Sequence, residues 1–211
     1  MDMKKTIMLL AVIGSLFFTS CSDDNDWDYD HSLENVYFFG PQVWGYESNK
    51  KSADNVAVYQ VEKGDVVAIP MQFWCEFIRS YDVTTFYYTT PKPIDQQYYP
   101  TPNDTKKVKY SGPELVRGVD YEVVDENGNV ISPDSDGAFS FLWKNAQKGV
   151  QNVYIKALPG AKSGSFNLQT FNPASSVKLS NQDVESTVQS RTDKYEVRIF
   201  TQNYYVTVTI K

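Results

Sequence analysis

The sequence predicts an all-β sandwich, and three observations support this prediction. From about residue 35 onward, apolar residues recur with period two over short segments. No segment sustains the i, i+3, i+4, i+7 spacing of an amphipathic helix over twelve residues. Residues that favour turns separate the alternating segments at the spacing of a sandwich. With 211 residues, 41% hydrophobic and 22% charged, the chain is large enough to bury a core.

The C-terminal segment has the clearest alternation. One side of it carries Tyr204, Val206, Val208 and Ile210. A similar segment, 195–199, precedes it, and the connection 201–203 is short enough for a hairpin. We therefore expect these two strands to pair.

A second hairpin is predicted from Phe139–Trp143 and 153–157, joined through Asn145 to Gly149. Further strands are expected at 35–39, 56–61, 66–77, 83–89 and 166–171, and the segment 121–124 leads into a tight turn at Asn127-Gly128. We expect about eight or nine strands in all. The polar segment 175–192 permits a short helix as an alternative. Four large aromatic residues in these strands are expected in the core: Trp74, Phe86, Phe141 and Trp143.

The N-terminus is typical of a secretory signal. Lys4 and Lys5 precede an apolar run over 6–18, and Thr19-Ser20-Cys21 follows. As a helix this run would span about 20 Å, which is short of the hydrocarbon core of about 30 Å. Cleavage before Cys21 is therefore preferred to a permanent membrane span.

The residues around Cys21 resemble a bacterial lipobox, although Phe18 stands where Leu is usual. The resemblance implies that Cys21 carries diacylglyceryl and acyl (palmitate) groups; the alternative is a secreted protein with a free cysteine. The acidic segment Ser22-Asp23-Asp24-Asn25-Asp26 follows directly. It resembles the export signal of Bacteroidetes lipoproteins displayed on the cell surface, and the alternative is a solvated tether. We expect a lipid anchor in the outer membrane, with the domain facing the exterior. The residues of the expected export signal are Ser22, Asp23, Asp24, Asn25 and Asp26.

These features divide the chain into a signal peptide at 1–20, an acidic flexible tether at 21–34 and a sandwich domain at 35–211. Once Cys21 carries lipid, Cys75 has no partner for a disulfide, and its apolar neighbours indicate a buried, inert thiol. The net charge of −6 provides no basic surface for nucleic acid. We therefore expect no nucleic-acid partner.

Several short motifs occur in a familiar order: Tyr37-Phe38-Phe39-Gly40, Thr84-Thr85-Phe86-Tyr87-Tyr88-Thr89, Gly118-Val119-Asp120-Tyr121-Glu122, Gly137-Ala138-Phe139-Ser140-Phe141 and Val153-Tyr154-Ile155. Together they resemble a Calx-β-type Ig-like domain. The start of the domain is also similar to domains of Bacteroidetes surface lipoproteins found beside starch-utilisation-type glycan systems. The resemblance implies an Ig-like (Calx-β-like) sandwich, with Gly-Xaa-Asp-Tyr as a structural signature.

Catalysis and metal binding have little support in the sequence. The single histidine, His31, lies in the tether, so no Ser-His-Asp or Cys-His set forms in the domain. One histidine and two cysteines cannot build a zinc site. The acids that bind calcium in the resembled family are missing from 158–164, and the remaining calcium alternative rests on Asp120, Asp125, Glu126, Asp134 and Asp136. We expect no enzyme activity, no metal and no cofactor; a glycan hydrolase is the remote alternative.

Candidate binding residues are aromatic side chains outside the alternation. Trp44 and Tyr46 lie near glycines, and Tyr98 and Tyr99 lie in a proline-rich loop at 91–113. Exposed rings there would stack on a sugar or anchor a protein, whereas the alternative is loop packing. The sequence thus favours a non-catalytic surface lipoprotein that captures glycan for an outer-membrane uptake system. The alternative is a structural or adhesive protein that binds a protein partner.

Overall fold

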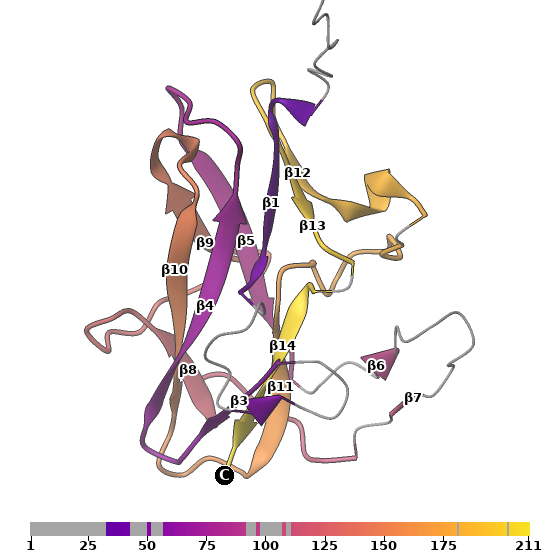
Figure 1. The fold of residues 1–211 in the computed structure, drawn as a ribbon. Coiled ribbons are helices and arrows are strands. Elements are labelled where there is room, and N and C mark those ends of the chain that lie inside the picture. Colours follow the sequence, from indigo (N-terminus) through magenta and orange to yellow (C-terminus); the bar gives the residue numbers. More distant parts are fainter. Residues whose placement is uncertain are drawn as a thin grey trace, which may run out of the picture. The chain divides into compact units, whose positions relative to one another are not determined.

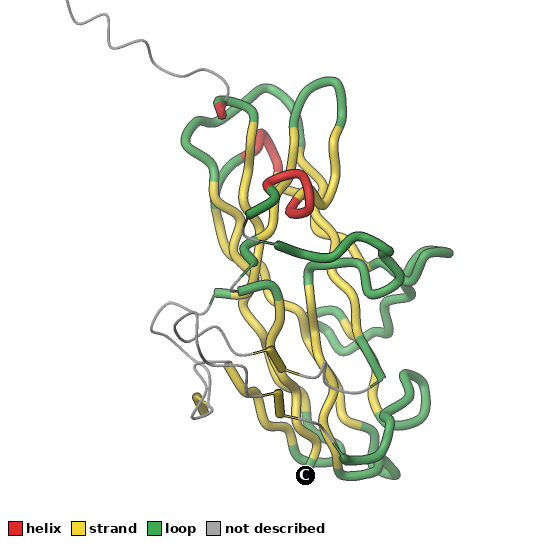
Figure 2. The backbone as a smooth tube through the Cα atoms, turned by 90° about the vertical axis from the view of Figure 1, so that its right-hand side faces the viewer, coloured by secondary structure: helices red, strands yellow, loops and turns green. Residues whose placement is uncertain are grey.

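A computed structural model describes residues 33–42, 50–51, 57–91, 96–97, 107–108, 111–180, 182–201 and 203–211. Residues Glu34–Lys211 form one compact unit, and its strands make two facing sheets (Figures 1 and 2). The predicted all-β sandwich is confirmed. In the described part of the chain, no helix is long and apolar enough to cross a bilayer.

The first sheet has six strands, which lie beside one another in Figure 1. β1 and β4 lie at its centre: β1 pairs in parallel with β13 and antiparallel with β4, and β4 pairs antiparallel with β10. In spatial order the strands are β12 (Val188–Arg191), β13 (Glu196–Ile199), β1 (Val36–Pro41), β4 (Val66–Trp74), β10 (Gly149–Ala157) and β8 (Tyr121–Val124).

The second sheet also has six strands and packs against the first. In spatial order they are β2 (Lys50–Lys51), β3 (Ala57–Val61), β14 (Tyr205–Ile210), β11 (Gly164–Gln169), β5 (Val83–Thr89) and β9 (Phe139–Trp143). A separate two-stranded pair joins β6 (Gln96–Gln97) to β7 (Lys107–Val108), inside the segment predicted to be a loop. The structure therefore has more strands than the sequence indicates, because two-residue strands leave no alternation to detect.

The predicted hairpin of Phe139–Trp143 with 153–157 is wrong. β9 pairs with β5 in the second sheet, whereas β10 pairs with β4 and β8 in the first. The connection between them contains the 3-10 turn η2 (Lys144–Ala146), in which Asn145 and Ala146 have φ of 53° and 48°. These left-handed residues turn the chain from one sheet to the other.

The predicted C-terminal hairpin is wrong for a similar reason. β13 lies in the first sheet, whereas β14 pairs with β11 and, in parallel, with β3 in the second. The turn between them bridges the two sheets, and its Asn203 side chain donates a hydrogen bond to the Pro41 carbonyl on β1 (2.8 Å). The expected inward side of β14 is confirmed for Val206, Val208 and Ile210, all of which are buried.

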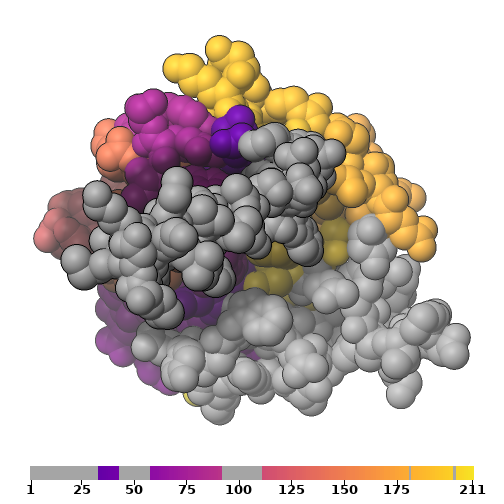
Figure 3. Space-filling view, turned by 45° about the horizontal axis from the view of Figure 1, so that its top comes forward, coloured from indigo at the N-terminus to yellow at the C-terminus, as the bar shows by residue number. Residues whose placement is uncertain are grey.

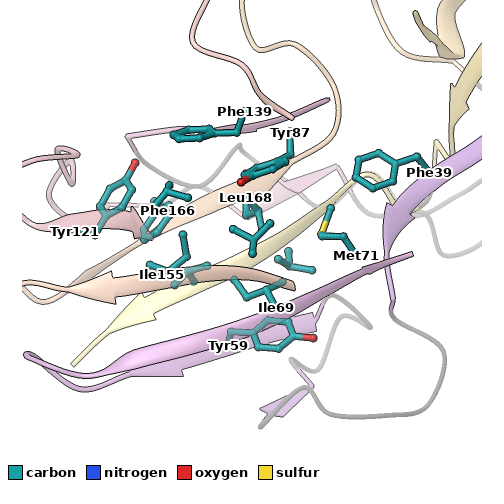
Figure 4. Close-up of a cluster of buried hydrophobic side chains, with 14 of the residues drawn as sticks. Phe39, Tyr59, Ile69, Met71, Tyr87, Tyr121, Phe139, Ile155, Phe166 and Leu168 are labelled. Carbon is teal, nitrogen blue, oxygen red and sulfur yellow. The ribbon is translucent and has the colours of Figure 1, made fainter. Parts of the chain in front are cut away.

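The core lies between the sheets. Side chains from both sheets point toward one another in Figure 4, among them Phe39, Ile69 and Leu168, each fully buried. Trp143 is buried as expected, and Phe141 packs against the core from a partly buried position. Large aromatic and aliphatic side chains from both layers thus provide the main stabilisation by excluding water.

The expectation that Trp74 and Phe86 lie in the core is wrong. In β4 the core-facing residue next to Trp74 is Phe73, so the pleat turns Trp74 outward. In β5 the core-facing residues are Thr85 and Tyr87, so Phe86 also points outward. Both rings are half-buried on outer sheet faces.

At Phe86, on the side of β5 that faces away from β9, a side chain of the first sheet takes the place of a neighbouring strand. The amide of Gln189, on β12, accepts from Phe86 N (2.8 Å) and donates to Phe86 O (2.8 Å) and Thr170 O (2.6 Å). It therefore acts as a peptide group between the two sheets. The 3-10 helix η3 (Val184–Thr187) precedes β12, so the helix alternative within 175–192 accounts for only one turn of that segment.

Candidate functional site

The residues singled out by sequence for lipidation, export and ligand binding all lie outside the described residues. Their roles therefore remain predictions from the sequence. They are Cys21, Ser22, Asp23, Asp24, Asn25, Asp26, Trp44, Tyr46, Tyr98 and Tyr99, and His31 lies outside the described residues as well.

Among the described acids, Asp120 has a structural role. Its side chain is 1% exposed and accepts hydrogen bonds from the backbone N–H groups of Val116 (2.8 Å) and Lys162 (2.9 Å). Burial alone would raise the pKa of this carboxyl, but those two hydrogen bonds and the Lys162 charge outweigh it, so the pKa is lowered. Asp120 therefore joins two surface turns instead of presenting its oxygens to a ligand.

Asp125 and Asp134 organise turns in the same manner. Asp125 Oδ1 accepts from the backbone N–H groups of Asn127 (2.9 Å) and Asn129 (2.8 Å), and Asp134 Oδ1 accepts from Asp136 N and Ala138 N (2.9 Å each). Within the described ranges, no group of three His, Cys, Asp or Glu side chains is arranged to hold a metal ion. Three of the five acids behind the calcium alternative, Asp120, Asp125 and Asp134, thus stabilise turns around β8 and β9.

A different feature marks a candidate site, namely the middle of the first sheet's outer face. We call it the central face and define it by the outward residues of β1, β4 and β10. Lys156 is the one charged residue among its twelve positions in these three strands, whereas a water-facing strand normally alternates apolar with polar or charged residues. The positions are Val36, Phe38, Gly40, Val66, Ala68, Pro70, Gln72, Trp74, Val150, Asn152, Tyr154 and Lys156.

Pro70 lies within this face without breaking the sheet. Its carbonyl accepts from Gln42 N (2.9 Å), immediately after β1 ends. The N–H and C=O groups of one residue in an antiparallel strand point to the same side. The N–H that proline lacks would therefore also have pointed toward β1, and not toward β10. Pairing with β10 through Asn152 therefore continues past the proline.

Three aromatic rings gather at one end of the central face. Phe38 and Trp74 are directly opposite each other on β1 and β4. Phe200, which follows β13, stacks on Phe38 at 5.0 Å between ring centroids and meets Trp74 edge-on at 5.1 Å. All three rings are half-buried, so they form an apolar patch that remains accessible from outside.

Gly40 determines how Phe200 reaches this patch. A Cβ atom on Gly40 would lie 2.9 Å from the Asn203 carbonyl oxygen and 3.8 Å from Phe200 Cδ2. Phe200 and Asn203 therefore lie directly against the bare backbone of β1. The hydrogen bond from Asn203 to Pro41 O fastens Asn203 there. A glycine is needed because of close packing, and not because of its φ angle.

Charged residues border the central face on both sides. Beside β1, Glu196 on β13 forms ion pairs with Arg198 and with Arg191 (2.6 Å). Burial opposes ionisation of Glu196, but the hydrogen bonds from Arg198 and Arg191 lower its pKa overall. On the β8 side, Arg117 lies 3.5 Å from Glu122.

Sequence reasoning missed this site. It assigned Trp74 to the core and gave no role to Phe38 or Phe200. The signal was partly present, because Tyr37 and Phe39 on one side of the strand leave Phe38 on the other. What was missing is the contact among residues 38, 74 and 200, which depends on the pairing of β1 with β4 and β13.

Comparisons with known proteins give few matches. No family model and no curated protein matches this chain. Two solved structures resemble it at 10% sequence identity. One is a complex of CaCohA2 with CaDoc0917, with a TM-score of 0.35, covering 83% of this chain and 99% of the other. The second is CaCohA2 from Clostridium acetobutylicum in solution, with a TM-score of 0.36, covering 84% and 92%. Neither likeness is strong enough to bear on function.

Proposed function

We propose that this chain is a non-catalytic binding module whose central face docks a protein partner. The observation that carries the proposal is the composition of that face: three clustered aromatic rings and uncharged neighbours, bordered by ion pairs on both sides. Protein interfaces share this plan, with an aromatic, charge-depleted centre and a polar rim. Trp is also among the residues that contribute most to binding energy.

The arrangement of the rings favours a protein over a sugar. Phe38 and Phe200 are nearly parallel, with 18° between ring planes, and each covers part of the other. Trp74 is nearly perpendicular to Phe200, at 89°. Sugar stacking uses open ring faces, whereas this cluster presents a compact apolar surface of ring edges and faces. Such a surface suits an apolar side chain of a partner protein.

Glycan capture is the second candidate, and a specific observation supports it. Gln72 and Asn152 place side-chain amides on the central face, and Tyr154 adds a hydroxyl that accepts from Asn152 Nδ2 (3.4 Å). Amides and hydroxyls beside an aromatic ring are suitable for binding sugar hydroxyls. Under this alternative the ligand would be neutral, because Lys156 is the one charge that the central face offers.

A photo-cross-linking experiment tests the proposal. A photoreactive phenylalanine replaces Gln72 or Tyr154 on the central face, or Leu142 on the outer side of the second sheet as a control, in cells that express the full chain. We expect one protein adduct from the two central-face positions and none from Leu142, which is 47% exposed. Trp74→Ala should reduce the adduct at least about tenfold, as expected for a binding hot spot.

The same variants, applied to a glycan array, distinguish the alternatives. Saccharide binding that disappears in Trp74→Ala, without a protein adduct, would replace the protein proposal by glycan capture. Equal adducts from Leu142 and Gln72, or none from any position in folded protein, would reject the central face as the docking site.

We also propose that Cys21 carries the lipid anchor, in the outer membrane and facing outward. Support comes from the signal-like segment before Cys21 and the acidic residues after it. Metabolic labelling with a palmitate analogue should mark the chain and should fail in Cys21→Ser. Protease added to intact cells should cut the wild type but spare a variant with Asp23, Asp24 and Asp26 replaced by Ala. Labelling of Cys21→Ser would contradict the anchor.

A further inference from the structure

An apolar tip lies at the end of the sandwich where the chain enters β1. The tip is Phe77 and Ile78 in the loop between β4 and β5, with 43% and 66% of their surfaces exposed. Adjacent exposed apolar side chains are typical of surfaces that contact a partner or a membrane. The mutually packed rings of the central face do not use these residues.

The tip is tied to the entry point of the chain. Arg79 Nη2 donates to the Glu34 carbonyl (2.8 Å) and pairs with the Glu34 carboxylate (3.1 Å), while the Arg79 guanidinium lies 5.3 Å from the Phe77 ring centre. In the same loop, Tyr81 donates to Asn35 Oδ1 (3.0 Å). Figure 3 views this end and shows the β4–β5 loop, in magenta, next to the start of β1, in indigo.

Chain length limits how far this end can lie from the anchoring residue. Thirteen peptide steps separate Cys21 from Glu34, and a fully extended chain of that length spans at most about 45 Å. The opposite end of the sandwich, at the β3–β4 turn with Lys63, is about 30 Å further along β4. A lipid at Cys21 therefore limits the distance between the bilayer and this end of the sandwich to about 45 Å. The same tether allows residues at the opposite end to lie about 30 Å further from the bilayer.

We propose that the tip rests in the membrane surface and orients the domain. This inference depends on the lipid anchor at Cys21 proposed above. The occupant is the lipid interface, because aromatic and aliphatic side chains gain from burial at the boundary between headgroups and acyl chains. The charges around the tip are balanced, so contact should be insensitive to salt and to anionic lipid. They include the ion pairs of Arg79 with Glu34 (3.1 Å) and of Lys144 with Asp82 (2.7 Å).

Spin-label depth measurements on the full lipoprotein in neutral phosphatidylcholine vesicles test this inference. In a Cys75→Ser background, the label is attached through Ser80→Cys, an exposed position in the same loop, or through Lys63→Cys at the opposite end. We expect the Ser80 label to collide more with membrane-dissolved oxygen, and less with a water-soluble nickel reagent, than the Lys63 label does. The difference should be severalfold and should persist in high salt.

Two double variants complete the test. Phe77→Ser with Ile78→Ser should bring the Ser80 label to the accessibility of the Lys63 label. Val116→Ser with Val119→Ser removes apolar residues of similar exposure (47% and 59%) elsewhere and should change nothing. Loss of the whole protein from vesicles, or an unmodified Cys21 by mass spectrometry, would show that the anchor itself fails. An anchored protein whose two labels are equally accessible to the nickel reagent would overturn the tip contact alone.

Discussion

The middle strands of the two outer faces are both poor in charge, yet they use their side chains differently. On the second sheet, β11 and β14 carry a polar ladder, which we define as Ser165, Asn167, Thr207 and Thr209. Ser165 bonds Thr209 across the strands (2.9 Å), and Thr207 donates to Asn167 Oδ1 (3.1 Å). Asn167 is fully buried and Thr207 is 8% exposed. On the central face of the first sheet, the rings and amides remain half-buried or exposed.

The difference between the ladder and the central face shows that a lack of charge does not by itself identify a binding surface. The ladder's hydrogen bonds join its own members, so its polarity stabilises the pairing of β11 with β14. The central face has few such bonds among its own side chains in the described structure, the contact of Asn152 with Tyr154 being one. Side chains that the fold leaves accessible are the ones available to a partner.

The largest effect should come from placing the same charge on the two faces. Asn167→Asp buries a carboxylate in the ladder. Among the described residues, Asn167 Nδ2 has no hydrogen-bond partner that this substitution would remove. The free energy of unfolding should fall by about 3 kcal/mol or more at neutral pH. Because burial raises the pKa of the new carboxyl, this loss should shrink as the pH falls toward its unfolded pKa of about 4. Urea unfolding between pH 4 and 8 measures both effects.

The matched control is Asn152→Asp on the central face, where the side chain is exposed. Its effect should stay within about 0.5 kcal/mol. Equal losses from both variants would end the distinction between a buried ladder and an accessible face.

A second prediction concerns Asp120, whose buried carboxylate accepts hydrogen bonds from two backbone N–H groups of the domain. Asp120→Asn replaces an oxygen that accepts a backbone N–H by an amide donor, and it should destabilise the domain by about 2 to 3 kcal/mol. The pKa of Asp120 is lowered in the folded state, so its contribution is present above pH 4 and is lost as the pH falls through the folded pKa. Stability of the wild type should therefore decrease below about pH 4 more steeply than that of Asp120→Asn.

Glu126→Gln serves as the control for Asp120, because Glu126 is an exposed acid in the turn after β8. Unfolding curves of this variant should match the wild type within about 0.5 kcal/mol. A wild-type pH profile identical to that of Asp120→Asn would contradict the role assigned to the buried carboxylate.

The smallest expected loss of stability concerns Gly40, which lies on the central face. Gly40→Ala forces a Cβ against the Asn203 carbonyl oxygen, at 2.9 Å, and should cost about 1 to 2 kcal/mol because Phe200 and Asn203 must shift. The shift should also move Phe200 away from Trp74 and change the tryptophan fluorescence. Gly160→Ala is the control, since a Cβ atom on Gly160 would meet nothing within 4 Å. It should be neutral or slightly stabilising. A neutral Gly40→Ala would mean that Asn203 is not pressed on β1.

Period-two alternation located most of the long strands from the sequence. The expected strand at 83–89 coincides with β5, and the segment 121–124 that leads into the predicted turn coincides with β8. Alternation is a local property of the chain, so it survives without knowledge of neighbours. It also identified the buried side of β14, where threonines and a tyrosine alternate with Val206, Val208 and Ile210.

The partners of the strands were decided only by tertiary structure. Short connections suggested hairpins for β9 with β10 and for β13 with β14, but each connection crosses between sheets. A few residues can either reverse a chain within a sheet or carry it across the core. Which of these two paths the chain takes depends on the burial of side chains such as Trp143 against residues that are distant in sequence. A local pattern of apolar residues does not record those contacts.

The candidate site depends on the same non-local information. In β4 both sides of the strand are largely apolar, so the sequence could not tell whether Phe73 or Trp74 faces the core. The sequence by itself determined that this chain builds strands with apolar faces and begins with a signal-like, acidic-flanked cysteine. Only the tertiary structure placed Phe38, Trp74 and Phe200 together, because their contact depends on the long-range pairing of β1 with β4 and β13.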